Sequence, residues 1–314
     1  MKVLFALLPL TVSAQQDPQF SQYMLNPYIW NPSYPALKDQ YVLSAHHRTQ
    51  WLGYSTSYNS DQIAAPSTQL FTATAPVLKL KSAFGIQVMN DDIGPLRNFT
   101  AGISYAYRID LGEGRLALGV GLGVGSMQVN SALWRAENPN DPTLSATNFT
   151  TVNQVRPNFR IGVSYGTENL FLGLSINNVS TPTYSLGTST IESRLVRHYY
   201  AQAGYTLYLS EVIRLQPSFI FKNISGVSSL ELSSLFLLNK LWFGMSYRTS
   251  DAVIGLVGLN IFPDNSLKLG YNIDLSVINA GGKSQTSHEI YLSYNIGSIL
   301  DNRKPIVRSP RFRL

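Results

Sequence analysis

Apolar residues alternate with small or polar residues along most of the chain, over stretches of roughly 9–13 residues. In residues 97–109, Phe99, Ile103 and Tyr107 fall on one face of an extended strand, and Gly102 falls on the other. A strand of about 9–11 residues can cross a bilayer at a tilt, whereas strands of soluble proteins are usually nearer 5–6 residues. The pattern therefore predicts membrane-spanning β-strands.

We predict an all-β fold, a transmembrane antiparallel β-barrel of about 14 strands formed by residues 41–297. An even number of strands is typical of bacterial single-chain barrels. The predicted strands are 41–51, 67–77, 81–91, 97–109, 114–128, 156–166, 169–179, 196–209, 212–222, 228–238, 240–249, 252–262, 266–277 and 287–297.

The predicted connections fall into two length classes. The short ones are 111–114, 167–169, 209–212 and 263–265, and the long ones are 52–66, 129–155, 180–195 and 279–286. Barrels of this kind have short periplasmic turns and longer external loops. The loop that contains Trp134 is rich in Asn, Asp, Pro and Thr, and it is either an external binding loop for cargo or simply a solvated loop.

Composition agrees with a membrane barrel. Hydrophobic residues make up 44% of the 314 residues and charged residues only 13%, whereas about a quarter of residues are charged in soluble proteins. Residues 1–14 have the features of a signal peptide, with Lys2, an apolar core and a small-residue cleavage site before Gln15. The chain has no cysteine, which excludes a disulfide-stapled secreted domain and leaves the periplasm and the outer membrane open.

Much of the net charge of +6 lies in the C-terminal tail, residues 298–314. An even number of strands places this tail and the mature N-terminus together on the periplasmic side. The tail either docks an acidic partner or is a solvated tail. We expect no binding of nucleic acid, because a signal peptide and a barrel argue against it. The basic residues are Arg303, Lys304, Arg308, Arg311 and Arg313.

The segment before the first strand, residues 15–40, has no clear period and is interrupted by prolines that exclude a regular helix or ladder strand. Because aromatic side chains bury large apolar areas when they pack, we predict an ordered segment at the periplasmic end of the barrel that can act as a plug. The alternative is a mobile leader. Its five aromatic residues are Phe20, Tyr23, Tyr28, Trp30 and Tyr34.

A run of alternate glycines forms one face of the predicted strand 114–128. It lacks the Gly-Lys-Ser/Thr ending of a phosphate-binding loop. A glycine face lets another backbone approach closely, so it is a candidate site for cargo or a partner; the alternative is a bend or tight packing within the barrel. These glycines are Gly119, Gly121, Gly123 and Gly125.

Catalytic chemistry is poorly supported, and we predict no enzyme activity, no cofactor and no metal. The histidines His46, His47, His198 and His288 lack metal-ligand spacing, and His46 and His47 point to opposite faces of a strand. Four charged residues fall on the inward face and either pair with one another or line a solute pathway. They are Arg108, Arg248, Lys268 and Asp274.

Several motifs resemble the PorP/SprF family of outer-membrane proteins of Bacteroidota. They begin with QQDPQFSQYMLNPYIWNPSYPAL after the predicted signal peptide and continue with HHRTQWLGY (46–54), DDIGPL (91–96), PNFRIGVSYGTENLFLGLSINNV (157–179), HYYAQAGY (198–205) and SHEIYLSYNIG (287–297). The resemblance covers nearly the whole mature chain. The stretch GYSTSYNSDQIAAPSTQL (53–70) departs from the family pattern, so we expect that loop to differ.

The resemblance implies an outer-membrane barrel of the type IX secretion and gliding-motility system. It implies a non-enzymatic protein that supports export or surface anchoring of large adhesin-like cargo through the cargo's C-terminal sorting domain. The expected partners are that cargo, other secretion components and outer-membrane lipid. The main alternative is a solute porin, which needs an open aqueous lumen; a barrel enzyme and a soluble β-sandwich are weaker alternatives.

Overall fold

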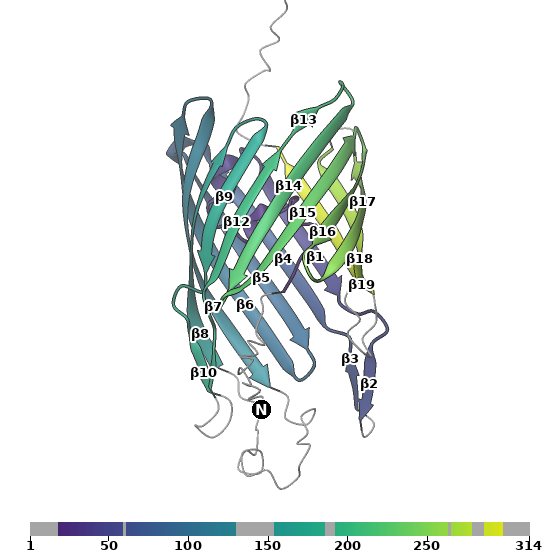
Figure 1. The fold of residues 1–314 in the computed structure, drawn as a ribbon. Helices are drawn as coiled ribbons and strands as arrows, with labels where there is room; N and C mark the ends of the chain where they lie inside the picture. Colours follow the sequence, from purple (N-terminus) through teal and green to yellow (C-terminus); the bar gives the residue numbers. More distant parts are fainter. Residues whose placement is uncertain are drawn as a thin grey trace, which may run out of the picture.

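The computed structural model describes residues 18–58, 61–129, 154–185, 192–262, 265–277 and 286–297. Fourteen long antiparallel strands close into a barrel, because β1 pairs with β19 as well as with β4 (Figure 1). The predicted fold is therefore confirmed. Among the described residues, no helix has the length and apolar character needed to cross a membrane.

Each long strand lies where the alternation predicts one. The strands are β1 (Tyr41–Thr49), β4 (Ser67–Val77), β5 (Ser82–Ile93), β6 (Leu96–Leu111), β7 (Gly114–Val129), β8 (Gln154–Gly166), β9 (Leu170–Asn177), β12 (His198–Tyr205), β14 (Ile213–Ile224), β15 (Val227–Leu238), β16 (Leu241–Arg248), β17 (Ala252–Ile261), β18 (Leu267–Ser276) and β19 (Thr286–Ile296). The two-residue β13 (Leu207–Tyr208) extends the hairpin between β12 and β14.

Four short strands form two further hairpins that the alternation does not predict. β2 (Ser55–Tyr58) pairs with β3 (Asp61–Ala64), and β10 (Thr183–Ser185) pairs with β11 (Glu192–Arg194). Both hairpins lie at the lower end of the barrel in Figure 1. Strands of three or four residues are too short for alternation to reveal them.

The two ends of the barrel differ in their connections. At one end, which we call the short-turn end, the strands are joined by 112–113, 167–169 and 209–212, and the chain enters β1. At the other, the long-loop end, the links include 50–66 and 178–197 with their hairpins. By the rule for such barrels, we infer that the short-turn end faces the periplasm.

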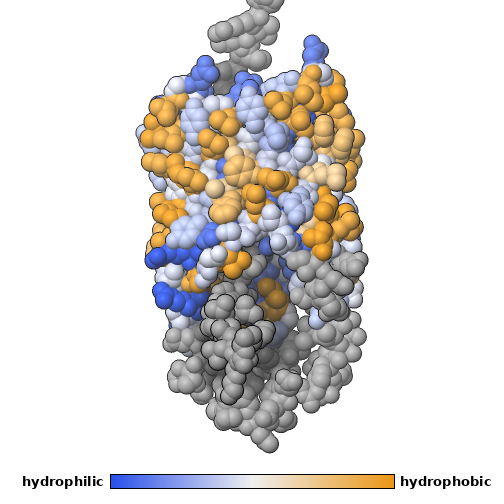
Figure 2. Space-filling model, in the orientation of Figure 1, coloured by the Kyte–Doolittle hydropathy of each residue, from blue (hydrophilic) through white to orange (hydrophobic). Residues whose placement is uncertain are grey.

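Side chains alternate between the lumen and the outer surface. In β16, Trp242, Gly244 and Ser246 are buried toward the lumen, whereas Phe243 and Met245 are exposed. The outward side chains make a broad apolar belt on the face shown in Figure 2. A belt of this kind is the surface that lipid chains cover.

We expect the Leu174→Arg substitution to destabilise the folded barrel by about 2–4 kcal/mol, because it places a charge within the lipid-facing belt. Leu174 lies near the middle of β9 and is 58% exposed. The matched control is Val155→Arg, at the long-loop end of β8 and 56% exposed, where about 0–1 kcal/mol is expected. The measurement is urea unfolding in lipid vesicles. Equal losses for the two variants would contradict this placement of the belt.

Candidate functional site: a lumen filled by the N-terminal segment

Residues 18–40 lie inside the barrel, and we call them the plug (Figure 1). Two 3-10 helices give the segment its shape: η1 (Pro27–Ile29) and η2 (Tyr34–Leu37). A proline stands in the first turn of each helix, where its fixed φ favours the turn and its missing N–H leaves no bond unmade. The rest of the plug has no helix or strand, so its remaining backbone N–H and C=O groups need hydrogen-bond partners from the barrel wall.

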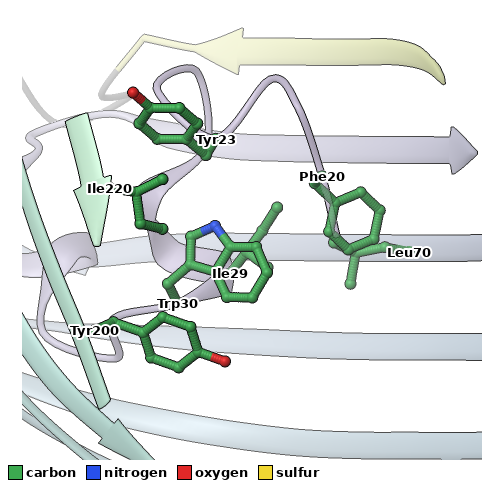
Figure 3. Close-up of a cluster of buried hydrophobic side chains, with 7 residues drawn as sticks. All are labelled: Phe20, Tyr23, Ile29, Trp30, Leu70, Tyr200 and Ile220. Atoms are coloured by element: carbon green, nitrogen blue, oxygen red, sulfur yellow. The ribbon is translucent and has the colours of Figure 1, made fainter. Parts of the chain in front are cut away.

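Apolar and aromatic side chains of the plug pack against three separate strands. Figure 3 shows Phe20, Tyr23, Ile29 and Trp30 of the plug with side chains from β4, β12 and β14. The ring centroids of Trp30 and Tyr200 are 5.0 Å apart. These contacts join β4 to the paired strands β12 and β14, which lie far from β4 around the barrel, so the plug is part of the core. The wall residues are Leu70, Tyr200 and Ile220.

Of the five aromatic residues that the sequence analysis singles out in this segment, Phe20, Tyr23, Tyr28 and Trp30 are almost completely buried, and Tyr34 is half-buried. Burial raises the pKa of the Tyr23 phenol, so its hydroxyl stays protonated, 3.2 Å from the Ser218 Oγ. The Tyr28 hydroxyl accepts a hydrogen bond from Ser104 at 2.8 Å. The polar ends of these rings therefore have partners on the wall.

Wall glycines make room for the plug backbone. A Cβ added at Gly119 would collide with the main chain of Ser33, and one added at Gly85 would collide with the ring of Tyr28. Of the four β7 glycines that the sequence pattern singles out, Gly119 is the one whose lack of a side chain leaves room for the backbone of the plug. Its neighbours on the same face of β7 have other contacts: Gly121 faces Arg160, a Cβ on Gly123 would press on the main chain of β6, and Gly125 accepts a 3.1 Å hydrogen bond from the hydroxyl of Tyr184.

Asn31 ties the middle of the plug to β8 and β9. Its Nδ2 lies within hydrogen-bond distance of the Val163 carbonyl (3.1 Å), the Ser164 Oγ (3.0 Å) and the Leu174 carbonyl (3.2 Å). Its Oδ1 accepts hydrogen bonds from the N–H and the hydroxyl of Ser33. The Asn31 side chain is fully buried, so its own amide group is shielded from water.

Ser21, near the first residue of the plug, is hydrogen-bonded to a group of buried charged side chains. Its N–H donates to Glu289 at 2.8 Å, and its hydroxyl donates to Asp274 at 2.8 Å. Two guanidinium groups donate to the same hydroxyl oxygen, Arg48 at 3.2 Å and Arg248 at 2.7 Å. One small residue therefore touches both signs of charge, which fixes the entry of the plug into the lumen.

The charges around Ser21 are paired with one another. Arg48 contacts Asp274 at 2.8 Å, and Arg248 contacts Glu231 at 2.7 Å. His46 lies 3.1 Å from a carboxylate oxygen of Glu289. All of these side chains are buried. A buried charge without a partner is strongly destabilising, so the pairs explain how ionisable groups occupy the lumen.

The inward charges predicted from the sequence have three different outcomes. Arg248 and Asp274 lie 3.4 Å apart, and Arg108 pairs with Asp39 of the plug at 2.6 Å. Lys268 has no carboxylate within ion-pair distance among the described residues. The pairing interpretation therefore holds for Arg248 and Asp274, and Arg108 finds its partner in the plug.

The predicted separation of two histidines is confirmed, since His46 is buried toward the lumen and His47 is exposed. Within the described part of the chain, no three His, Asp or Glu side chains are grouped so that they could hold a metal ion. Trp134, the predicted signal peptide and the basic residues of the tail lie outside the described residues.

The sequence pattern does not single out Ser21, Asn31, Arg48 or Glu231. The signal that could have found Arg48 and Glu231 is parity along the strand, because both fall on the lumen face that carries small and polar residues. Ser21 and Asn31 cannot be found by parity, because the sequence of the plug shows no regular alternation of apolar and polar residues.

A sequence profile decides the family. Residues 12–294 match the profile of the type IX secretion system membrane protein PorP/SprF. The chain belongs to the PorP/SprF family. The resemblance seen in the sequence motifs is thereby confirmed, and family and fold together place the protein in the outer membrane. No curated protein is significantly similar to the chain in sequence.

Solved structures of outer-membrane barrels share the fold of this PorP/SprF protein. The TodX deltaS2S3 mutant monoaromatic hydrocarbon channel matches with a TM-score of 0.52 and 11% identity over 87% of this chain and 94% of that chain. The Pseudomonas putida toluene transporter TodX matches with a TM-score of 0.50 and 12% identity over 85% of this chain and 92% of that chain. Identities this low show a shared fold alone.

The Asn31→Ala substitution should destabilise the docked plug by about 1–3 kcal/mol, because it removes the hydrogen bonds that the buried Asn31 side chain makes to β8, β9 and Ser33. The measurement is the rate at which protease cleaves within residues 18–40 of the folded barrel. The control is Asn223→Ala, which removes a hydrogen bond to Ser228 near the 225–226 turn at the surface, and should leave the cleavage rate unchanged. An Asn31→Ala plug that resists protease as well as the parent would contradict this role.

Acid should loosen the short-turn end of the plug through Asp39. Partial burial favours the neutral acid, but hydrogen bonds from Arg115 and Arg108 outweigh it and hold the pKa of Asp39 below its ordinary value. Stability from this carboxylate is present above the ordinary aspartate pKa of about 4 and is lost as the pH falls through the lower folded value. Protease cleavage near residue 39 should therefore rise below about pH 4. Asp39→Asn should remove that rise, and a persistent rise in the variant would contradict the assignment.

Proposed function

We propose that this PorP/SprF protein is a non-enzymatic barrel that supports the export or surface anchoring of large secreted cargo through the cargo's C-terminal sorting domain. Family membership supplies the secretion system. The observation that carries the proposal is the filled lumen: the plug is bonded to the wall at Ser21, Asn31 and Asp39, along its whole described length. A barrel built in this way is suited to act as a scaffold.

Cargo docking is most favourable at the long-loop end. β6 and β7 are each 16 residues long, whereas β16 has 8 residues, so the wall rises higher on one side and its inner face extends beyond the plug. Gly123 lies on that inner face and lines a small cavity with Asn158, Asn178 and the edge of the plug. The two amides hydrogen-bond to each other and leave the Asn158 Oδ1 and the Asn178 Nδ2 without partners. A glycine and unused amide atoms favour the close approach of an extended segment of another chain.

A solute porin is the alternative function. Structural neighbours are described as a hydrocarbon channel and a toluene transporter, and a conducting barrel needs a continuous aqueous path. Within the described residues the plug crosses the lumen from Ser21 to Asp39. We therefore expect no steady, porin-like conductance from the purified protein in planar bilayers, and steady conductance would favour the porin.

The scaffold role is tested by locking the plug. A Cβ added at Gly162 would lie 3.0 Å from the Asn31 Cγ, so cysteines at 31 and 162 can join, and the chain has no other cysteine. We expect deletion of the gene to abolish surface display of cognate cargo, and Asn31→Cys/Gly162→Cys to restore display equally under oxidising and reducing conditions. The measurement is protease shaving of intact cells.

The two single-cysteine variants are the matched controls, because they carry each change without the crosslink. Normal display in the deletion strain would overturn the role in cargo export. Loss of display only when the disulfide forms would show that the plug must move, which would overturn the closed-scaffold form of the proposal.

A further inference from the structure

A cavity of about 410 Å³ lies inside the barrel at the short-turn end, between the plug and the wall made by β8, β9, β12 and β14. Residues of two turns, 112–113 and 167–169, contribute to its lining, so the cavity reaches the rim. Tyr23 and Tyr34 form part of its plug side. Its volume is within the range of cavities that hold ligands in proteins, about 300–1,000 Å³.

Gln202 lines this cavity, and both polar atoms of its side chain are unused. The side chain lines the cavity and is only 4% exposed. Neither its Oε1 nor its Nε2 has a hydrogen-bond partner within the described part of the chain. Buried side-chain amides almost always have partners, so an orphaned one marks a place where a partner from outside fits.

The strand register explains why the wall offers Gln202 no partner. Its neighbours across the sheet are Gly173 on β9 and Ile220 on β14. The next lumen-facing positions on β12 are Tyr200, which is hydrogen-bonded to His198, and Gly204. Glycine has no side chain and the isoleucine side chain cannot hydrogen-bond, so neither neighbour offers the carboxamide a side-chain partner.

The surrounding chemistry fits a peptide. A carboxamide presents one donor group and one acceptor in a plane, which matches the N–H and C=O of a peptide unit. The Oδ1 of Asn169 is a second unpartnered acceptor in the lining. The rim carries charges of both signs, with Lys38 and Arg115 opposed by Glu113 and Glu168, so it does not select an anion or a cation. Aromatic side chains, including Tyr34 and Phe171, offer apolar contact for a side chain.

We infer that this cavity is a binding site for a short peptide segment of another protein, which enters from the short-turn end and pairs its backbone amide with Gln202. The site is at the opposite end of the barrel from the docking place proposed for surface cargo, and it goes beyond that function. It stands whether or not the barrel displays cargo, because it rests on Gln202 and the cavity alone.

The test uses the full chain in detergent with Thr206→Cys, which places the protein's only thiol in the cavity lining. The probe is N-acetyl-trialanine amide, and the measurement is the rate at which a maleimide labels the thiol. We expect the peptide to slow labelling. Adding Gln202→Leu should weaken that protection about tenfold, because two neutral hydrogen bonds are lost. A probe with an ester in place of the central amide N–H should also protect less well.

Two controls separate binding from misfolding. Gln202→Leu keeps the size of the side chain and removes an unpaired buried amide, so its unfolding midpoint in urea should not fall. Gln69→Leu, at the long-loop end of β4, should leave protection unchanged. Protection that is equal in the parent and in Gln202→Leu would overturn the proposal, and so would the absence of protection by the peptide. Equal protection by N-methylacetamide or maltotriose would show a solute site and would overturn the assignment to peptide.

Discussion

The width of a fourteen-strand barrel is the constraint on which the rest of this structure depends. A barrel of about eight strands can be filled by its own side chains, whereas barrels of about 16–18 strands leave an aqueous channel. This barrel lies between those limits, and much of its inner face is small or polar, as at Gly119, Ser164 and Ser175. The wall cannot close its interior alone. The plug supplies the missing apolar volume with Phe20 and Trp30, and the small wall residues are what admit its backbone.

The pairing of the buried charges also depends on the plug. Once the plug excludes water from the lumen, Arg48, Arg248 and Asp274 are tolerated only as pairs with further hydrogen bonds. Ser21 supplies those bonds through its N–H and hydroxyl. The plug and the ion pairs therefore stabilise each other: the charges hold the plug, and the plug completes the hydrogen bonding of the charges. This mutual dependence explains why a segment whose regular structure is limited to two short 3-10 helices is ordered.

Period-two alternation was sufficient to predict every long strand and to place His46 and His47 on opposite faces. It could not predict the contacts that matter for the plug. Asn31 meets Ser164 across 133 residues, and Ser21 meets Glu289 across 268. Which residues reach the same height in the lumen depends on the stagger and closure of all fourteen strands, and no local pattern encodes these.

The contacts that hold the two ends of the plug differ in how far they are exposed to water. At Ser21 the bonds are buried, so salt screens them little. At Asp39 the partners are Arg108 and Arg115, at 2.6 Å and 2.7 Å, but the carboxylate is 43% exposed, and exposed pairs contribute little and weaken with salt. The ion pairs at the short-turn end are therefore the contacts of the plug that salt weakens more. The cavity that carries Gln202 is at this same end, so the salt-sensitive contacts of the plug lie near the part of the wall with unused hydrogen-bonding groups.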